Sequence, residues 1–293
     1  MHEDHTSGAS EILPVAAERV LTALAGAGAQ PAALAPALRA VVSEQPAMGA
    51  VHRLVSRALE VARTAAASGL AERESAGQIE EAVRAFAADY DSASARIVDL
   101  AAEELLPEQG FVATWSRSSL VERAFLEARR RGKRCGALVA ESRPLAEGRR
   151  LATTLAEAGL PVLFASDAAL PSLLAGTAGI LIGADAVRPQ SFLHKVGTTA
   201  LLLAGREVGL AAHALAQEAK FLPAEAALLD LVQRDPAQVW ADAPGGVRVL
   251  NPTFEEVDLR LLRGVATERT VLPPGEAAAV ARETRLDAEL AKR

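Results

Sequence analysis

The 293-residue sequence has little cysteine, few aromatic residues and no long apolar run. Its single cysteine, Cys135, excludes an internal disulfide framework and a cysteine-rich zinc site. No apolar run reaches the roughly 18 residues that a membrane span needs, and the polar first ten residues lack the pattern of a signal peptide. The five histidines show no metal-ligand spacing, so the sequence predicts no metal site. We therefore expect a cytoplasmic protein that does not contact a membrane.

Charge and composition limit the partners and the size of the core. The formal net charge is -6, which argues against a nucleic-acid partner because such binding needs a basic face. Aromatic residues make up only 3% of the chain while half of it is hydrophobic, so leucine, valine, isoleucine and alanine must build the core. This length and apolar content suffice for one large domain or two smaller ones.

The first third of the sequence has the apolar spacing of helices. Apolar residues recur every three or four positions from Glu11 to Leu106, interrupted only by short glycine and proline breaks. Residues 48–67 and 78–106 favour two long helices. We expect a helical amino-terminal domain of about four helices over residues 1–107.

From Gly110 onward, short apolar runs alternate with amphipathic segments. We expect strands at 111–114, 135–140, 162–165, 179–183 and 211–216, and helices at 118–131, 146–158 and 197–208. Strands that alternate with helices of about a dozen residues predict a parallel sheet with right-handed crossovers. The sequence therefore predicts an α/β protein, in which the helical domain is followed by a Rossmann-like parallel sheet flanked by helices over residues 108–293.

Polar clusters follow the predicted strands. They are residues 114–119, Ser142-Arg143-Pro144 with Gly148-Arg149, Ser166-Asp167, Gly183-Ala184-Asp185 and, further on, residues 194–198. Residues just past the carboxyl ends of parallel strands converge on one crevice, where ligands bind. Helix amino termini at the same edge present N–H groups that suit phosphate. The concentration of arginine, lysine and aspartate there is typical of a site for a small phosphorylated molecule.

Each member of this set also has a structural explanation. Ser118 and Ser119 can cap a helix, and the arginines and the lysine can lie on solvated turns or helix surfaces. The ligand interpretation assigns phosphate binding to Arg117, Ser118, Ser119, Arg143, Arg149 and Lys195. It predicts that Asp185 accepts hydrogen bonds from sugar hydroxyls, or acts as an acid/base catalyst if the site is active.

The same residues resemble a known family. It unites the alpha, beta and delta subunits of translation initiation factor 2B with ribose-1,5-bisphosphate isomerase and methylthioribose-1-phosphate isomerase. The matching motifs are Ser142-Arg143-Pro144 with Gly148-Arg149, Asp167, Gly183-Ala184-Asp185, Lys195-Val196-Gly197-Thr198, Glu218-Ala219-Lys220-Phe221, residues 251–255 and residues 266–268. They occur in order along residues 110–273. The resemblance implies a helical domain joined to a Rossmann-like domain, and homodimers built through the latter.

The chain departs from the isomerases at the reacting centre. Their catalytic cysteine lies in a Thr-x-Cys-x-(Ser/Thr) pattern, whereas here Ser116 occupies that place after Thr114. A serine hydroxyl is a poor proton shuttle near neutral pH. The resemblance carries their catalytic aspartate onto Asp185, and His194 stands where asparagine normally precedes the lysine. The Arg-Gly-Ala phosphate loop of their helical half has no clear match.

Three functional interpretations follow. The first is an initiation-factor-2B-like protein that binds a phosphorylated sugar or a nucleoside monophosphate. The second is an aldose–ketose isomerase on a sugar phosphate such as ribose 1,5-bisphosphate, using Asp185 with Ser116 or His194 as the substitute acid. The third is a structural or regulatory dimer with a relict pocket, against which the retained charges argue. The missing cysteine argues against the second. We expect the first, as a homodimer without a cofactor; whether a translation partner exists stays open.

Overall fold

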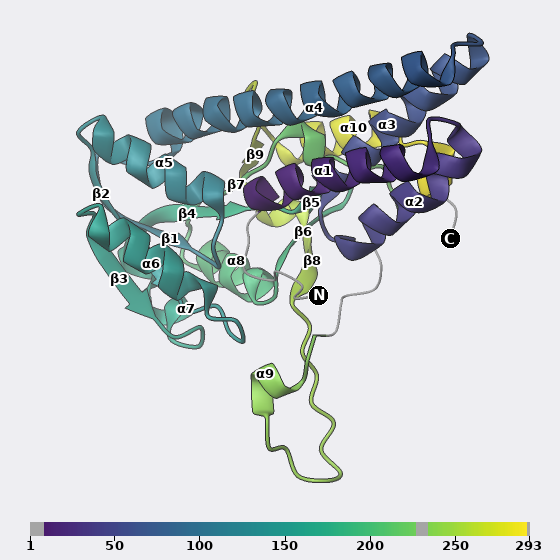
Figure 1. The fold of residues 1–293 in the computed structure, drawn as a ribbon. Coiled ribbons are helices and arrows are strands. Elements are labelled where there is room, and N and C mark those ends of the chain that lie inside the picture. Colours follow the sequence, from purple (N-terminus) through teal and green to yellow (C-terminus); the bar gives the residue numbers. More distant parts are fainter. Residues whose placement is uncertain (1–8, 227–233, 292–293) are drawn as a thin grey trace.

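The computed structural model describes residues 9–226 and 234–291. The amino-terminal part is helical, as predicted (Figure 1). Its elements are α1 (Ala9–Ala27), α2 (Pro31–Glu44), α3 (Gly49–Ala67), α4 (Glu72–Leu100) and the π-helical turn η1 (Ala101–Leu105). Helix α3 buries Val51, Leu54, Val55 and Leu59, the three-and-four spacing of a core-facing stripe. Figure 1 shows the long α4 running over both halves of the molecule.

A seven-stranded sheet forms the second part and confirms the predicted α/β class. Its elements are β1 (Gln109–Thr114), α5 (Ser119–Arg130), β2 (Arg134–Ala140), α6 (Glu147–Glu157), β3 (Val162–Ala165), α7 (Leu170–Leu173), η2 (Leu174–Gly176), β4 (Thr177–Gly183), α8 (Thr198–Glu207), β7 (Ala212–Leu215), β9 (Gly264–Ala266), β10 (Val271–Leu272) and α10 (Pro274–Glu283). The strand order is β10-β9-β7-β4-β1-β2-β3. All neighbouring strands are parallel except β10, which pairs antiparallel with β9.

Helices cover both faces of this sheet. Consecutive residues of a strand point to opposite faces, and in β4 Ile180 packs in the cluster of Leu201 from α8, whereas Leu181 packs in the cluster of Phe125 from α5. All four residues are buried. Burial on both faces explains why the strands are apolar runs without alternation.

A second, three-stranded antiparallel sheet is a feature that the sequence did not predict. It has the order β5-β6-β8. The remaining elements are β5 (Ala186–Val187), β6 (Ser191–Lys195), β8 (Phe254–Asp258), η3 (Glu218–Lys220), α9 (Ala237–Trp240), η4 (Leu259–Leu261) and α11 (Ala288–Ala291). His194 and Lys195 are the last two residues of β6 and pair with Glu255 and Phe254 of β8.

The carboxyl-terminal segment returns to the helical part. Both oxygens of the Asp287 carboxylate accept hydrogen bonds from the Arg63 guanidinium, at 2.6 and 2.9 Å, and Leu290 joins the core of the helical part. The domain boundary expected after residue 107 stays a prediction.

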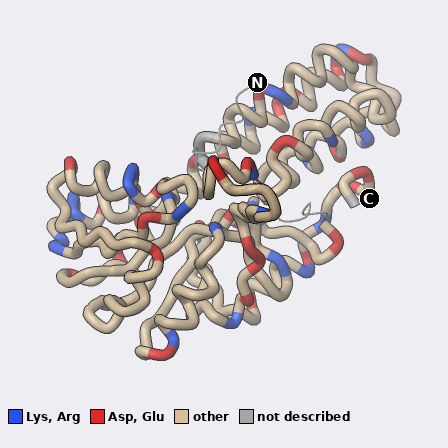
Figure 2. The backbone as a smooth tube through the Cα atoms, turned by 90° about the horizontal axis from the view of Figure 1, so that it is seen from below, with Lys and Arg blue, Asp and Glu red and all other residues tan. Residues whose placement is uncertain are grey.

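Surface charge and hydropathy add two observations. In the view of Figure 2, acidic and basic segments are interspersed along the described chain rather than gathered into one basic stripe. None of the described helices combines the length and the apolar character needed to cross a membrane.

Candidate functional site

The order of the large sheet reverses between β1 and β4. From β1 the chain continues to β2 and β3 on one side, whereas β7 and β9 extend the sheet from β4 on the other. Ligands of open α/β sheets bind at such a switch point, beyond the carboxyl ends of the strands. A Cβ atom on Gly183, the last residue of β4, would lie 2.7 Å from Ser118 Oγ. Glycine therefore allows the start of α5 to lie directly against the end of β4.

Two serines in left-handed backbone conformation connect the neighbouring strand ends. Ser116 and Ser142, after β1 and β2, both have φ of 62°, a conformation that occurs preferentially at functional sites when the residue is not glycine. The Ser116 N–H donates to Ser142 Oγ at 2.7 Å. The N–H groups of Ser142 and Arg143 donate to the two carboxylate oxygens of Asp167, at 2.6 and 2.7 Å. Asp167 thus holds the loop after β2 from the end of β3.

Six polar side chains gather at this edge, and we call them the carboxyl-edge cluster. They are Ser116, Glu147, Asp185, His194, Lys195 and Lys220. Glu147 Oε1 accepts from Lys195 Nζ at 2.8 Å, and its other oxygen accepts from Ser116 Oγ at 3.3 Å. The side chains of Glu147 and Lys195 are only 8% and 9% exposed. The Lys195 ammonium also lies 4.6 Å from the centre of the Phe254 ring, a cation–π contact.

Asp185 and Lys220 are the two members of the cluster whose burial shifts their pKa values in opposite directions. Burial raises the pKa of Asp185, and the nearby charges of Lys220 and Lys195 lower it in part. Burial also lowers the pKa of Lys220 to about 8, against the opposing effect of Asp185. The Lys220 ammonium donates to the main-chain oxygen of Ala184 at 2.7 Å. Burial thus raises the pKa of Asp185 and lowers that of Lys220, and shifted pKa values of this kind are typical of groups at functional sites.

His194 is buried and neutral. Burial, together with the charges of Lys195 and Lys220, lowers its pKa to about 3. Its Nδ1 lies 2.7 Å from Thr198 Oγ1, whose own hydroxyl donates to the Lys195 main-chain oxygen at 2.6 Å. Because a hydroxyl has one proton, Nδ1 must be the donor to Thr198, which leaves Nε2 unprotonated. His194 can accept a hydrogen bond from a ligand but cannot supply a proton near neutral pH.

The helical part reaches this edge through α3 and α4. The Gly49 N–H, at the start of α3, donates to the Asp185 main-chain oxygen at 2.8 Å. A Cβ on Gly49 would lie 2.5 Å from the Lys220 main-chain oxygen, so no larger residue fits there unless the backbone moves. Tyr90 of α4 is buried, and its pKa is raised by burial and by the charge of Asp185. Both halves of the chain thus contribute to the surroundings of Asp185.

The structure places the remaining predicted residues outside this cluster. The Arg117 Nε donates to Glu122 at 3.1 Å, and the Arg117 side chain is only 8% exposed. Ser118 precedes α5, but its side chain makes no capping hydrogen bond. The Arg149 side chain is 67% exposed and forms an ion pair with Glu141. Arg143 is exposed at the loop after β2. The phosphate roles of these residues, and of Ser119 at the start of α5, stay predictions.

Two members of the cluster were not named as site residues from the sequence. Glu147 directly precedes Gly148 in the motif after β2, and Lys220 belongs to Glu218-Ala219-Lys220-Phe221. Each lies at a strand-to-helix connection on the same edge of the sheet, a position that could have marked it. Each also begins or ends a helical turn, where a charged side chain is ordinarily solvated.

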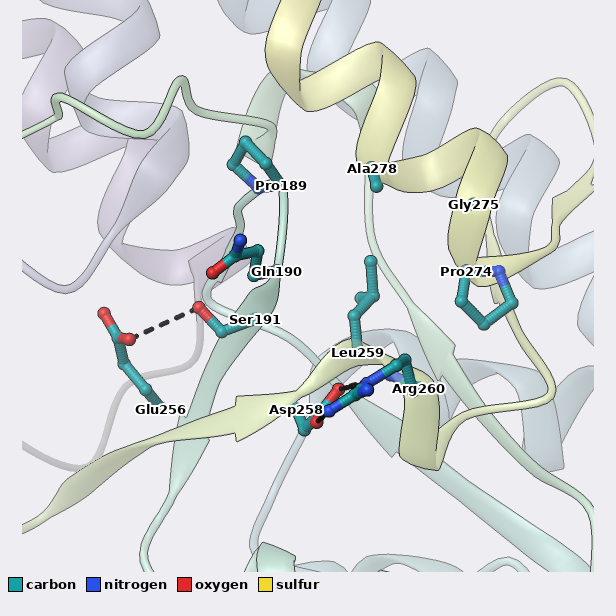
Figure 3. Close-up of a pocket in the computed structure, with 10 residues that line it drawn as sticks. All are labelled: Pro189, Gln190, Ser191, Glu256, Asp258, Leu259, Arg260, Pro274, Gly275 and Ala278. Carbon is teal, nitrogen blue, oxygen red and sulfur yellow. Dashed lines mark hydrogen bonds and ion pairs between the residues drawn. The ribbon is translucent and has the colours of Figure 1, made fainter.

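A pocket of about 630 Å³ lies elsewhere, between the β6–β8 edge and the start of α10 (Figure 3). None of the predicted site residues lines it. Its arginine, Arg260, is paired with Asp258 at 2.6 Å, and Glu256 adds a second carboxylate. This lining does not favour a phosphorylated ligand. Within the described part of the chain, no group of three or more histidine, cysteine or acidic residues is placed to hold a metal ion.

These features define an α/β protein with a charged site at the switch point of a Rossmann-like sheet. The model of the Initiation factor 2 subunit family matches residues 9–274. The chain therefore belongs to this family, which confirms the resemblance found in the sequence.

The individual proteins that the chain resembles are of two kinds, isomerases and translation initiation factors. The chain is 34% identical over 159 residues to the ribose 1,5-bisphosphate isomerase of Haloferax volcanii, covering 52% of this chain and 49% of that one. It is 27% identical over 211 residues to the ribose 1,5-bisphosphate isomerase of Thermococcus kodakarensis, covering 69% and 65%. The matches thus span about half to two thirds of these relatives. Among solved structures, the translation initiation factor eIF-2B of Pyrococcus horikoshii OT3 superposes with a TM-score of 0.79 at 23% identity, over 92% of this chain and 93% of that one.

Proposed function

We propose that the chain binds a small phosphorylated sugar, or a nucleoside monophosphate, at the carboxyl edge of its large sheet. The observation that carries the proposal is the carboxyl-edge cluster, because Asp185, Lys195 and Lys220 are desolvated ionisable groups with shifted or paired charges at the switch point. The relatives that are ribose 1,5-bisphosphate isomerases support a sugar phosphate as the ligand. We also propose that this binding takes place in the cytoplasm.

In this proposal, different polar groups bind the sugar and the phosphate of the ligand. Asp185 and the unprotonated Nε2 of His194 accept hydrogen bonds from sugar hydroxyls. Arg143 and the first turn of α5, with Ser118 and Ser119, take the phosphate, because a helix amino terminus and a guanidinium both favour an anion.

The proposal is tested by calorimetric titration with ribose phosphates and nucleoside monophosphates. At least one of them should bind and raise the melting temperature, because a ligand specific for the folded state stabilises it. Arg143→Ala should weaken binding about ten- to a hundredfold, since a charge-assisted hydrogen bond contributes roughly 1.5–3 kcal/mol. Arg282→Ala, at an exposed arginine of α10, is the matched control. If Arg143→Ala binds as tightly as the native protein, the phosphate has been placed wrongly.

Isomerase chemistry is the second candidate. It would require Asp185 and a second proton carrier, for which the sequence offers Ser116 and His194. The pKa of His194, about 3, argues against an imidazolium acid near neutral pH. Ser116, which we propose stands in place of the isomerases' cysteine, retains a poorly acidic hydroxyl. Binding without efficient turnover is therefore the better supported function.

We also propose that the chain forms a homodimer through its α/β part. The packing of α8 motivates this, because Leu201 and Leu202 are buried whereas Leu203 and Val208 remain 43% and 47% exposed. Leu203 of α8 and Val208, the residue directly after this helix, leave apolar side chains exposed, and contiguous exposed apolar surface is typical of an interface. Light scattering at micromolar concentration should return twice the mass of the chain, and a monomer mass would contradict the proposal.

A further inference from the structure

Most of the cations near the carboxyl edge are already neutralised by carboxylates of the same chain. Lys195 pairs with Glu147 at 2.8 Å, and both side chains are about nine-tenths buried. Arg117 pairs with Glu122 at 3.1 Å, and its side chain is equally inaccessible. A phosphate that approached either cation would have to displace a buried carboxylate or lie against it.

The main-chain donors after β2 are occupied in the same way. Two successive N–H groups, of Ser142 and Arg143, both point at the carboxylate of Asp167, at 2.6 and 2.7 Å. Successive N–H groups of this kind can cradle a phosphate in other proteins. Here the chain supplies its own anion, so this loop has no donor pair left for a ligand.

Arg143 is the exception among the predicted phosphate-binding cations. Arg149 is held by Glu141 on the exposed surface. In contrast, no carboxylate in residues 9–226 and 234–291 forms an ion pair with the Arg143 guanidinium, which is exposed in the loop between β2 and α6. Among these predicted cations, Arg143 is therefore the unpaired one within the described residues, and it is available to an incoming phosphate together with the amino terminus of the 12-residue helix α5. Lys220, which also lacks a carboxylate partner within the described residues, is buried and donates to the Ala184 main-chain oxygen.

We infer that the ligand carries one phosphoryl group rather than two, and that the Glu147–Lys195 ion pair sets this limit. The inference rests on the proposed function and narrows its ligand class. A second phosphoryl group at Lys195 would bring up to two negative charges beside the Glu147 carboxylate in a poorly solvated place, where like charges repel most strongly. A neutral hydroxyl at the same position can accept a hydrogen bond from Lys195 without disturbing the pair.

Glu147 is well held for this role. One oxygen accepts from Lys195 and the other from Ser116, at 2.8 and 3.3 Å. A carboxylate that is fixed at both oxygens cannot turn away from an incoming anion without losing both hydrogen bonds. Glu147 is thus a specificity-determining residue that acts through Lys195.

The test compares three ligands that share one sugar: ribose 1-phosphate, ribose 5-phosphate and ribose 1,5-bisphosphate, titrated calorimetrically into the full chain. The native protein should bind the better monophosphate at least about tenfold more tightly than the bisphosphate. Glu147→Gln keeps an acceptor for Ser116 but removes the charge. It should raise the affinity for the bisphosphate relative to that for the monophosphates about tenfold or more, equivalent to about 1.4 kcal/mol.

Two further variants separate charge from structure. Glu147→Asp retains the negative charge and should retain the preference for a monophosphate. Glu157→Gln removes the same charge from the last turn of the same helix, about 15 Å along its axis, and should leave the preference unchanged. A purely structural role for Glu147 would weaken all three ligands together and would not change their ratio.

The outcomes distinguish this inference from the function on which it rests. If the native protein binds the bisphosphate more tightly than either monophosphate, the inference is wrong while the proposed function stands. If neither monophosphate nor the bisphosphate binds and no nucleoside monophosphate binds either, the proposed function fails, and the inference fails with it. The native ratio needs no variant, so the inference remains falsifiable even if Glu147→Gln does not fold.

Discussion

The buried ammonium of Lys220 should make the stability of the protein rise with pH. Its pKa is lowered by burial from 10.5 to about 8, and the nearby charge of Asp185 recovers only part of the loss. The group is 4% exposed, and one main-chain oxygen, that of Ala184, accepts from it at 2.7 Å. The folded chain therefore holds this proton less tightly than the unfolded chain does.

The size and direction of the effect follow from the two pKa values, 10.5 and about 8. Below pH 8 both states are protonated, and the lysine opposes folding by about 3 kcal/mol, since one pKa unit corresponds to about 1.4 kcal/mol. Between pH 8 and 10.5 the folded state is neutral while the unfolded state still binds the proton, so this opposition shrinks as pH rises. Between pH 7 and 9 the free energy of unfolding should increase by about 1 kcal/mol from this group.

Urea denaturation at pH 7, 8 and 9 measures this slope. Other groups also titrate in this range, so the slope must be compared with that of Lys220→Met, which keeps the length of the side chain and removes the charge. The difference between the two proteins, about 1 kcal/mol across the range, is the contribution of Lys220. Parallel pH profiles for the native protein and Lys220→Met would refute the argument, because they would mean that the buried lysine is not destabilised in its charged form.

Two further predictions concern packing and turnover. Gly49→Ala should lower the free energy of unfolding by roughly 1–3 kcal/mol, since its Cβ would lie 2.5 Å from the Lys220 main-chain oxygen; Gly77→Ala, with no atom within 4 Å of its Cβ, should stabilise α4 by up to about 1 kcal/mol. Equal effects of both variants in urea denaturation would contradict the close approach. The native protein should convert ribose 1,5-bisphosphate slowly or not at all, and Ser116→Cys should convert it faster; robust native turnover lost in Asp185→Asn would make the chain an isomerase.

The parallel sheet was predictable because its signal is local. Residues such as Ile180 and Leu181 lie in an apolar run bounded by glycines, and helices of about a dozen residues follow β1 and β2. The antiparallel sheet was not predictable on the same basis. Strand β5 has only two residues, and β6 pairs with β8, which begins at Phe254, nearly sixty residues after Lys195. Neither a strand of two residues nor a pairing between segments so far apart along the chain leaves a periodic pattern to detect.

The residues of the candidate site likewise include some that could be predicted from the sequence and some that could not. Ser116, Asp185 and Lys195 were predictable, since the carboxyl ends of parallel strands converge whatever their side chains are. Glu147 and Lys220 were not, because their burial depends on how α6 and η3 pack against other strands. Isolated charged residues at the ends of helical turns are usually solvated, so the sequence alone favours the wrong environment for both.

The pairing of the cations at the strand ends is the property of the candidate site that is hardest to predict from the sequence. Counting cations at the strand ends gives several candidate phosphate ligands, but a cation binds a phosphate well only where no carboxylate has neutralised it first. Glu122 lies five residues from Arg117, and Glu147 lies 48 residues from Lys195. The first pairing joins residues that are close in the sequence, whereas the second requires the folded structure. Because the second pair is buried, tertiary contacts rather than the motifs themselves decide which of these cations are neutralised, and under our proposal they also limit the number of phosphoryl groups that the site accepts.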